Sequence, residues 1–154
     1  MTLSPNQFRQ TSAPGYLDLQ TGNNNVWNCR VSKATPSTDP DLIGGQTVVQ
    51  VDVKSAVPTV RAATIGQVPF GLVKTSLKDT GFTDLANLEI ARVGTVIYLT
   101  ASAAIAAGAD VQYDPTTHKI ATKASTNGII GQAVDKALAD GDLIRVLVNP
   151  ASGA

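Results

Sequence analysis

The chain has 154 residues, of which 43% are hydrophobic, so it fits one domain whose core needs no metal or disulfide to fold. Lys and Arg number 12, and Asp and Glu also number 12; this zero net charge gives no basic face for nucleic acid. A single cysteine excludes an intrachain disulfide, and no apolar run reaches the roughly 20 residues of a membrane helix.

Residues 1–44 are predicted to form an extended, irregular N-terminal arm. Four prolines and the polar run at 22–25 disfavour long regular elements, because proline removes a backbone donor and Asn and Gly favour turns. The start of the arm lacks the basic segment and apolar run of a secretory signal, which predicts synthesis in a cytoplasm. Large apolar residues are nevertheless scattered along it, so we expect the arm to pack against its own body or a neighbour. These residues are Phe8, Tyr16, Leu17, Leu19 and Trp27.

From residue 45 onward the chain is rich in β-branched residues and punctuated by turns. Short strands separated by turns every 8 to 12 residues are typical of an all-β fold, here a small barrel or tulip-like sandwich. The longest strand candidate covers 88–99, with Gly94 as a bend or bulge. The other strand candidates are 47–53, 59–64, 68–73, 111–113, 119–122, 129–135 and 143–148.

Similar short motifs recur in the same order, which predicts two approximate repeats at 45–99 and 106–148. For example, 70–73 (Phe-Gly-Leu-Val) parallels 130–133 (Ile-Gly-Gln-Ala), and 90–93 parallels 143–146. Chance similarity between β-rich segments is the alternative. The predicted organisation is therefore an arm at 1–44, a β-rich domain at 45–150 and a short tail at 151–154.

The sequence offers little for catalysis or metal binding, so we expect no enzyme, no metal and no cofactor. His118 is the only histidine and stands in a turn with no second ligand at metal-binding spacing. Cys29 is more simply a small buried residue than a reactive thiol. Asp140 and Asp142 resemble a fragment of a calcium loop whose remaining ligands are missing, and turn chemistry explains them better.

Interface anchors are the more plausible functional residues. Tyr16 and Trp27 are large aromatics with a polar edge, a type enriched at protein interfaces. The competing interpretation is that they fold back onto their own sheet. Arg92 and Arg145 each lie inside a predicted strand and suit a sheet face or subunit contact.

The C-terminal half resembles the capsid decoration, or cement, proteins of tailed bacteriophages. The resemblance is carried by 106–114 (Ala-Ala-Gly-Ala-Asp-Val-Gln-Tyr-Asp), 130–134 (Ile-Gly-Gln-Ala-Val) and 141–148 (Gly-Asp-Leu-Ile-Arg-Val-Leu-Val). It covers residues 100–150 well and 45–99 loosely, and leaves the arm out. Each motif alone is weak, and their order and spacing carry the match.

This resemblance implies a virion protein on the outer face of an icosahedral head. Its partners would be the major capsid protein, whose neighbouring subunits it clamps against the pressure of packaged DNA, and further copies of itself, as a homotrimer or a dimer. The seven candidate interface residues are Phe8, Tyr16, Leu17, Leu19, Trp27, Arg92 and Arg145. The alternative is a virion-surface or head-fibre module that contacts host glycans.

Overall fold

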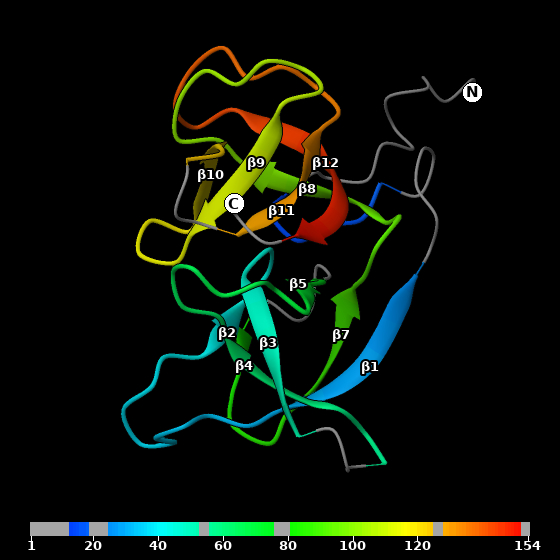
Figure 1. Ribbon diagram of the computed structural model, residues 1–154. Helices are drawn as coiled ribbons and strands as arrows, with labels where there is room; N and C mark the ends of the chain where they lie inside the picture. The colour runs from blue at the N-terminus through cyan, green and yellow to red at the C-terminus, as the bar shows by residue number, and fades with distance from the viewer. Residues whose placement is uncertain (1–12, 19–24, 53–55, 76–80, 125–127, 152–154) are drawn as a thin grey trace, which may run out of the picture.

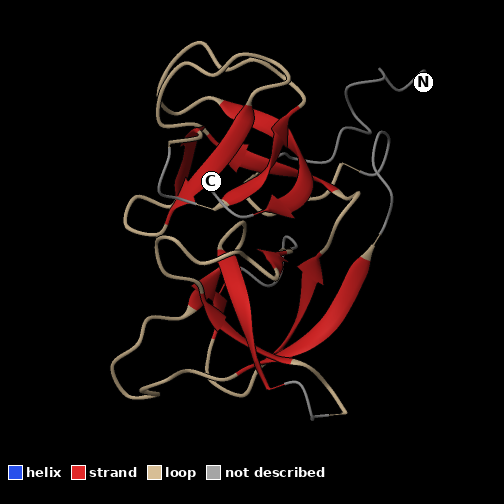
Figure 2. Ribbon diagram, in the orientation of Figure 1, coloured by secondary structure: helices blue, strands red, loops and turns tan. Residues whose placement is uncertain are grey.

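The computed structural model describes residues 13–18, 25–52, 56–75, 81–124 and 128–151, and these contain twelve strands and no helix (Figures 1 and 2). This agrees with the predicted all-β class. The strands are β1 Val26–Val31, β2 Leu42–Ile43, β3 Thr47–Asp52, β4 Thr59–Ala62, β5 Gly71–Val73, β6 Gly81–Phe82, β7 Asn87–Ala91, β8 Val96–Thr100, β9 Asp110–Asp114, β10 Lys119–Thr122, β11 Ile129–Ala133 and β12 Leu143–Ala151.

The strands form two stacked β units, seen as the lower and upper halves of Figure 1. In the lower unit, β1-β4-β3-β5-β7 close into a barrel, and the short pair β2-β6 lies beside it. In the upper unit, β10-β9-β11-β12-β8 form a five-stranded sheet. That sheet curls toward closure, because Ala101 just after β8 makes a parallel bridge to Ile120 of β10.

Part of the predicted arm is a wall of the barrel. Val26–Val31 form β1, which pairs with β7 along its length and with β4 at Arg30 and Val31. Cys29 and Val31 are fully buried while Asn28 and Arg30 are exposed, the alternation of a half-buried strand. The prolines and the Asn run on either side of this segment predicted an irregular chain. The strand forms because it pairs with β4 and β7, which lie far away in sequence.

The predicted long strand at 88–99 is two strands in different units. Asn87–Ala91 belong to the barrel and Val96–Thr100 to the upper sheet. The chain turns between them at Gly94, whose φ of 90° lies in the left-handed region that favours glycine. Gly94 marked a bend in the predicted strand, but the apolar residues on both sides of it gave no indication that the two halves belong to different sheets.

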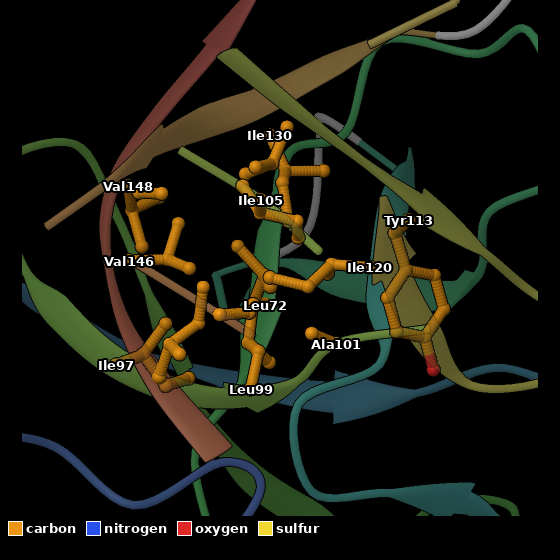
Figure 3. Packing of buried hydrophobic residues seen from close by; sticks show 14 of the residues in the cluster. Leu72, Ile97, Leu99, Ala101, Ile105, Tyr113, Ile120, Ile130, Val146 and Val148 are labelled. Carbon is orange, nitrogen blue, oxygen red and sulfur yellow. The ribbon is translucent and has the colours of Figure 1, made fainter. Parts of the chain in front are cut away.

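Two hydrophobic cores lie back to back and share strands. Val73 and Ile90 point into the barrel core, whereas their neighbours Leu72 and Ala91 point into the core of the upper sheet. All four side chains are fully buried. Figure 3 shows Leu72 among Ile97 and the other residues of the upper core. Because successive residues of a strand face opposite sides, β5 and β7 serve both cores.

The upper sheet repeats the strand order of the barrel. Reading β4-β3-β5-β7-β1 beside β10-β9-β11-β12-β8, each neighbouring pair is antiparallel in both units. In addition, β1 meets β4 in parallel, as the residue after β8 meets β10. This match supports the hypothesis of two repeats, but with different bounds: the first unit begins at β1 and the second at β8.

A glycine lies at the equivalent position in both units, where the backbones of neighbouring strands come close together; we call this position the crossing. Gly71 of β5 lies opposite Val48 of β3, and Gly131 of β11 lies opposite Val111 of β9. A Cβ on Gly71 would lie 2.5 Å from a carbonyl oxygen of β7, and a Cβ on Gly131 would overlap a carbonyl oxygen of β12. Those oxygens belong to Ala91 and Leu147, which makes these two residues equivalent.

The equivalence extends to the strands on the far side of β7 and β12. Val26 of β1 lies opposite Ala91, and Val96 of β8 lies opposite Leu147. Val26 and Val96 are therefore equivalent, and β1 holds in the barrel the place that β8 holds in the upper sheet.

We expect Gly131→Ala to lower the free energy of unfolding by about 3 kcal/mol, because a rigid backbone carbonyl occupies the space its methyl group needs. Urea unfolding followed by circular dichroism measures this. The matched control is Gly81→Ala in β6, where an added Cβ has no atom within 4 Å, and it should stay within about 0.5 kcal/mol of the parent. Equal stabilities of the two variants would contradict the close crossing.

Candidate functional site

The residues predicted to lie at an interface separate into two groups in the structure. One group gathers on the upper sheet and the other at the start of β1. The first group is Tyr16, Leu17 and Arg145, and the second is Trp27 and Arg92. The remaining two, Phe8 and Leu19, lie outside the described residues.

Residues 13–18 lie along the outer edge of β8 as an added antiparallel strand. Leu17 forms an antiparallel bridge with the middle of β8. The N–H of Tyr98 donates to the carbonyl of Tyr16 at 2.8 Å, and the carbonyl of Tyr98 accepts from the N–H of Gly15 at 2.9 Å. Tyr16 and Leu17 are each only 5% exposed. Within one chain, both therefore pack on their own body.

Arg145 of β12 fastens this segment by charge. Its guanidinium binds the carboxylate of Asp135 at 2.7 and 2.9 Å and that of Asp18 at 3.1 Å. The hydrogen bonds to the two carboxylates raise the pKa of Arg145, and the bond from Arg145 lowers the pKa of Asp135. Arg145 thus links residues 13–18 to the upper sheet, and nothing in the sequence pattern paired it with either carboxylate.

Three glycines let the same segment approach the barrel. The N–H of Thr75 donates to the carbonyl of Gly15 at 3.0 Å. A Cβ on Gly15 would lie 2.6 Å from the backbone nitrogen of Gly45, and a Cβ on Gly44 would lie 2.8 Å from the carbonyl oxygen of Pro14. Backbone packs directly on backbone here, so residues 13–18 contact both units.

Trp27, Phe70 and Arg92 form the second group, which we call the Trp27 cluster. The Arg92 guanidinium carbon lies 3.8 Å from the Phe70 ring centre and 5.0 Å from the Trp27 ring centre. The two aromatic rings meet edge to face at 5.8 Å. A cation held between aromatic faces is stabilised by their electron density. Trp27 remains 45% exposed, so the cluster presents an aromatic surface on a rigid barrel.

Arg92 is only partly satisfied within the cluster. One terminal nitrogen donates to the carbonyl of Phe70, while its buried Nε finds no hydrogen-bond partner in the described part of the chain. Burial lowers the pKa of Arg92. Arg92 and Arg145, aligned in the repeat hypothesis, thus have different surroundings. The strand register also separates them, because it makes Leu147 equivalent to Ala91, whereas aligning the two arginines would make Leu147 equivalent to Gly94.

The chain's one cysteine and one histidine lie in different β units. Cys29 is fully buried in the barrel core, and burial raises the pKa of its thiol, which disfavours the thiolate. Nδ1 of His118 lies 2.9 Å from the hydroxyl of the buried Tyr113. Across the described residues, no three His, Cys, Asp or Glu side chains gather as a metal site would require. No helix among those residues is long and apolar enough to cross a membrane.

Nothing in the sequence identified Phe70, Asp18 or Asp135 as partners of the predicted residues. Phe70 comes directly before Gly71 of β5. Its carbonyl accepts a hydrogen bond from Arg92, and its ring lies against the Arg92 guanidinium. In the sequence, Asp18 and Asp135 have no feature that distinguishes them from other polar loop residues. Each contact joins two different strands or loops, from 10 to 127 positions apart, and depends on how they meet in the fold, so the sequence alone could not pair them.

Comparison with solved structures adds one similar fold. The crystal structure of the head fibre gp8.5 N base in bacteriophage phi29 matches with a TM-score of 0.52 and 13% sequence identity, covering 80% of this chain and 92% of that chain. At this identity the similarity concerns the fold alone. No curated protein matches the sequence.

The phage cement protein family matches residues 35–149, which include both β units except strand β1 and the last two residues of β12. The match confirms the resemblance read from the C-terminal motifs. Membership of this family supports a structural role in the phage virion. The chain belongs to the phage cement protein family.

Proposed function

We propose that the protein binds the outer face of the phage head as a homo-oligomer and clamps neighbouring major capsid subunits together. Packaged DNA pushes outward, so contacts between capsomers are the places where a shell yields. A protein that holds two capsomers at once resists their separation by avidity, even where each contact is weak. The family match supports this proposal, and the resemblance suggests a trimer or a dimer.

The Trp27 cluster is the observation that favours a gripping surface. Exposed tryptophan and arginine on a rigid support are the residue types that most often dominate binding energy. The barrel holds Trp27 in place through β7, and Phe70 and Arg92 limit the positions of its ring. A preorganised anchor loses little entropy on binding.

Residues 13–18 have a different part in this proposal, which is to join the two β units into one rigid clamp. They bind β8 of the upper sheet and contact Gly44, Gly45 and Thr75 of the barrel unit. A clamp under load must not bend between its two contact points. The Arg145 bridge to Asp18 holds this connection in place.

The glycan-binding alternative finds less support. Glycan sites commonly use several exposed aromatic rings, and among the described residues Trp27 alone is an aromatic side chain with a large exposed fraction. A glycan array probed with the purified protein distinguishes the two functions, because a clamp gives no specific signal there.

Phage heads that carry the protein should survive heating several degrees above the temperature that opens heads grown without it. DNA release measured by dye fluorescence during a temperature ramp gives both values. Cryo-electron microscopy of the same heads should place the protein across capsomer boundaries on the outer face. Equal release temperatures, or density on the inner face, would exclude the clamp.

Trp27→Ala should weaken binding to heads lacking the protein by roughly 30-fold, the effect of losing about 2 kcal/mol at a binding hot spot. Co-sedimentation of titrated protein with the heads measures this. Leu138→Ala is the control, since Leu138 is 72% exposed on the upper unit away from the cluster, and it should bind like the parent. If both variants bind equally well, the Trp27 cluster is not the anchor.

Asp18→Asn should loosen residues 13–18 from β8, because it removes one charge from a partly buried ion pair worth about 1 kcal/mol. The amide of Tyr98, which donates to Tyr16, should then exchange with solvent deuterium about fivefold faster. Asp140→Asn removes an exposed partner of Lys119 and should leave this rate unchanged. An unaltered Tyr98 rate in Asp18→Asn would show that charge does not hold the segment.

A further inference from the structure

Strand β1 holds in the barrel the position that β8 holds in the upper sheet. Val26 and Val96 are equivalent by register, so two residues further on Asn28 corresponds to Tyr98. The outer edges of β1 and β8 can therefore be compared position by position, as two equivalent sites within one molecule.

The outer edge of β8 is occupied by an extended chain. Tyr98 both donates to and accepts from residues 13–18, and the N–H of Asp18 donates to the carbonyl of Val96 at 2.8 Å. This edge binds an extended antiparallel segment through main-chain hydrogen bonds, the mode of binding called strand addition.

The matching edge of β1 points its hydrogen-bonding groups away from β7. The N–H of Val31 donates to the carbonyl of Ala86 on the β7 side, while the N–H of Arg30 donates to Pro58 on the β4 side. Because these directions alternate along a strand, Asn28 directs its N–H and carbonyl to the same side as Arg30.

No described strand meets those groups. Strand β4 pairs with β1 only at Arg30 and Val31, and β7 covers the opposite edge. Pro58, the residue next to the start of β4, has no N–H to offer the carbonyl of Asn28. The side chain of Asn28 is also exposed. Among the described residues, the edge at 26–29 is therefore open where its counterpart on β8 is covered.

Positive side chains border this open edge. Arg92 lies at the start of β1 over Trp27, Arg30 projects from its second half, and Nε of Arg61 donates to the carbonyl of Ser32 just beyond its end. None of the three arginines forms an ion pair with a described carboxylate. Glu89, opposite Asn28 on β7, is already paired with Lys74.

We propose that the β1 edge at 26–29 binds an extended, acidic segment of the major capsid protein as an added antiparallel strand. This inference rests on the proposed function and specifies its contact. Main-chain bonds to Asn28 give the register, carboxylates of the segment pair with the bordering arginines, and an acceptor on it can satisfy Nε of Arg92. Residues 13–18 on β8 are the internal precedent for this geometry.

Asn28→Pro tests the edge directly. Proline removes an N–H that points away from β7, so no barrel hydrogen bond is lost, but the ring blocks an incoming strand. We expect binding to heads lacking the protein to weaken at least about tenfold, with an unchanged circular dichroism spectrum. Asn28→Ala keeps the N–H and should bind within about threefold of the parent.

Hydrogen–deuterium exchange on the full-length parent protein provides a second measurement, independent of any folding defect in the proline variant. The amides of Val26 and Asn28, which point away from β7, should exchange at least about tenfold more slowly when the protein is bound to heads. Arg30→Glu should also weaken binding and reduce its dependence on salt, because it removes an attractive charge.

The outcomes separate this inference from the clamp itself. If the parent protein fails to bind heads, both proposals fall. If it binds and Asn28→Pro binds equally, or the amides of Val26 and Asn28 gain no protection on heads, only the β1 contact is overturned. If analytical ultracentrifugation of the free protein shows an oligomer that Asn28→Pro abolishes, the edge belongs to a second copy, and the capsid segment is excluded from it.

Discussion

Strands β5 and β7 face two hydrophobic cores at once, and the rest of the molecule depends on this shared wall. Val73 and Ile90 fill the barrel while Leu72 and Ala91 fill the upper core, and all four side chains are fully buried. Full burial of each large side chain contributes about 1.5–3 kcal/mol. Movement of one unit against the other at this wall would expose apolar side chains of both cores, so their burial opposes such movement.

The two units repeat one architecture but use their edges differently. In the upper sheet the outer strand is covered by residues 13–18, which are fastened by Arg145 and by close backbone contacts at Gly15 and Gly45. In the barrel the matching strand carries the Trp27 cluster at its start, and no described strand pairs with its outer edge at Asn28. Closing one edge internally protects it from unwanted strand pairing, and leaving the other open makes it available to a partner. This asymmetry distinguishes the two matched edges and is the basis of the contact proposed for β1.

Much of the fold could be predicted because local chemistry and global structure agree. The β-branched runs at 47–53, 59–64 and 143–148 became strands, and the recurring Phe-Gly and Ile-Gly pairs marked the crossings at Gly71 and Gly131. The errors lie where tertiary contacts override local pattern. Val26–Val31 became a strand among prolines and asparagines because β7 supplied a partner, and the run at 88–99 divided at Gly94 because its two halves belong to different sheets.

The sequence alone determined the class of molecule: an all-β chain with a balanced charge, no reactive cluster and motifs of the phage cement family, since composition, turn residues and periodicity are local properties. Only the tertiary structure decided which predicted anchors are available. Tyr16 and Leu17 are buried on β8, Arg145 is engaged by two carboxylates, and Trp27 stays exposed beside Arg92 and Phe70. Exposure and pairing depend on residues more than 100 positions apart, as for Asp18 and Arg145, and no local pattern encodes such a separation.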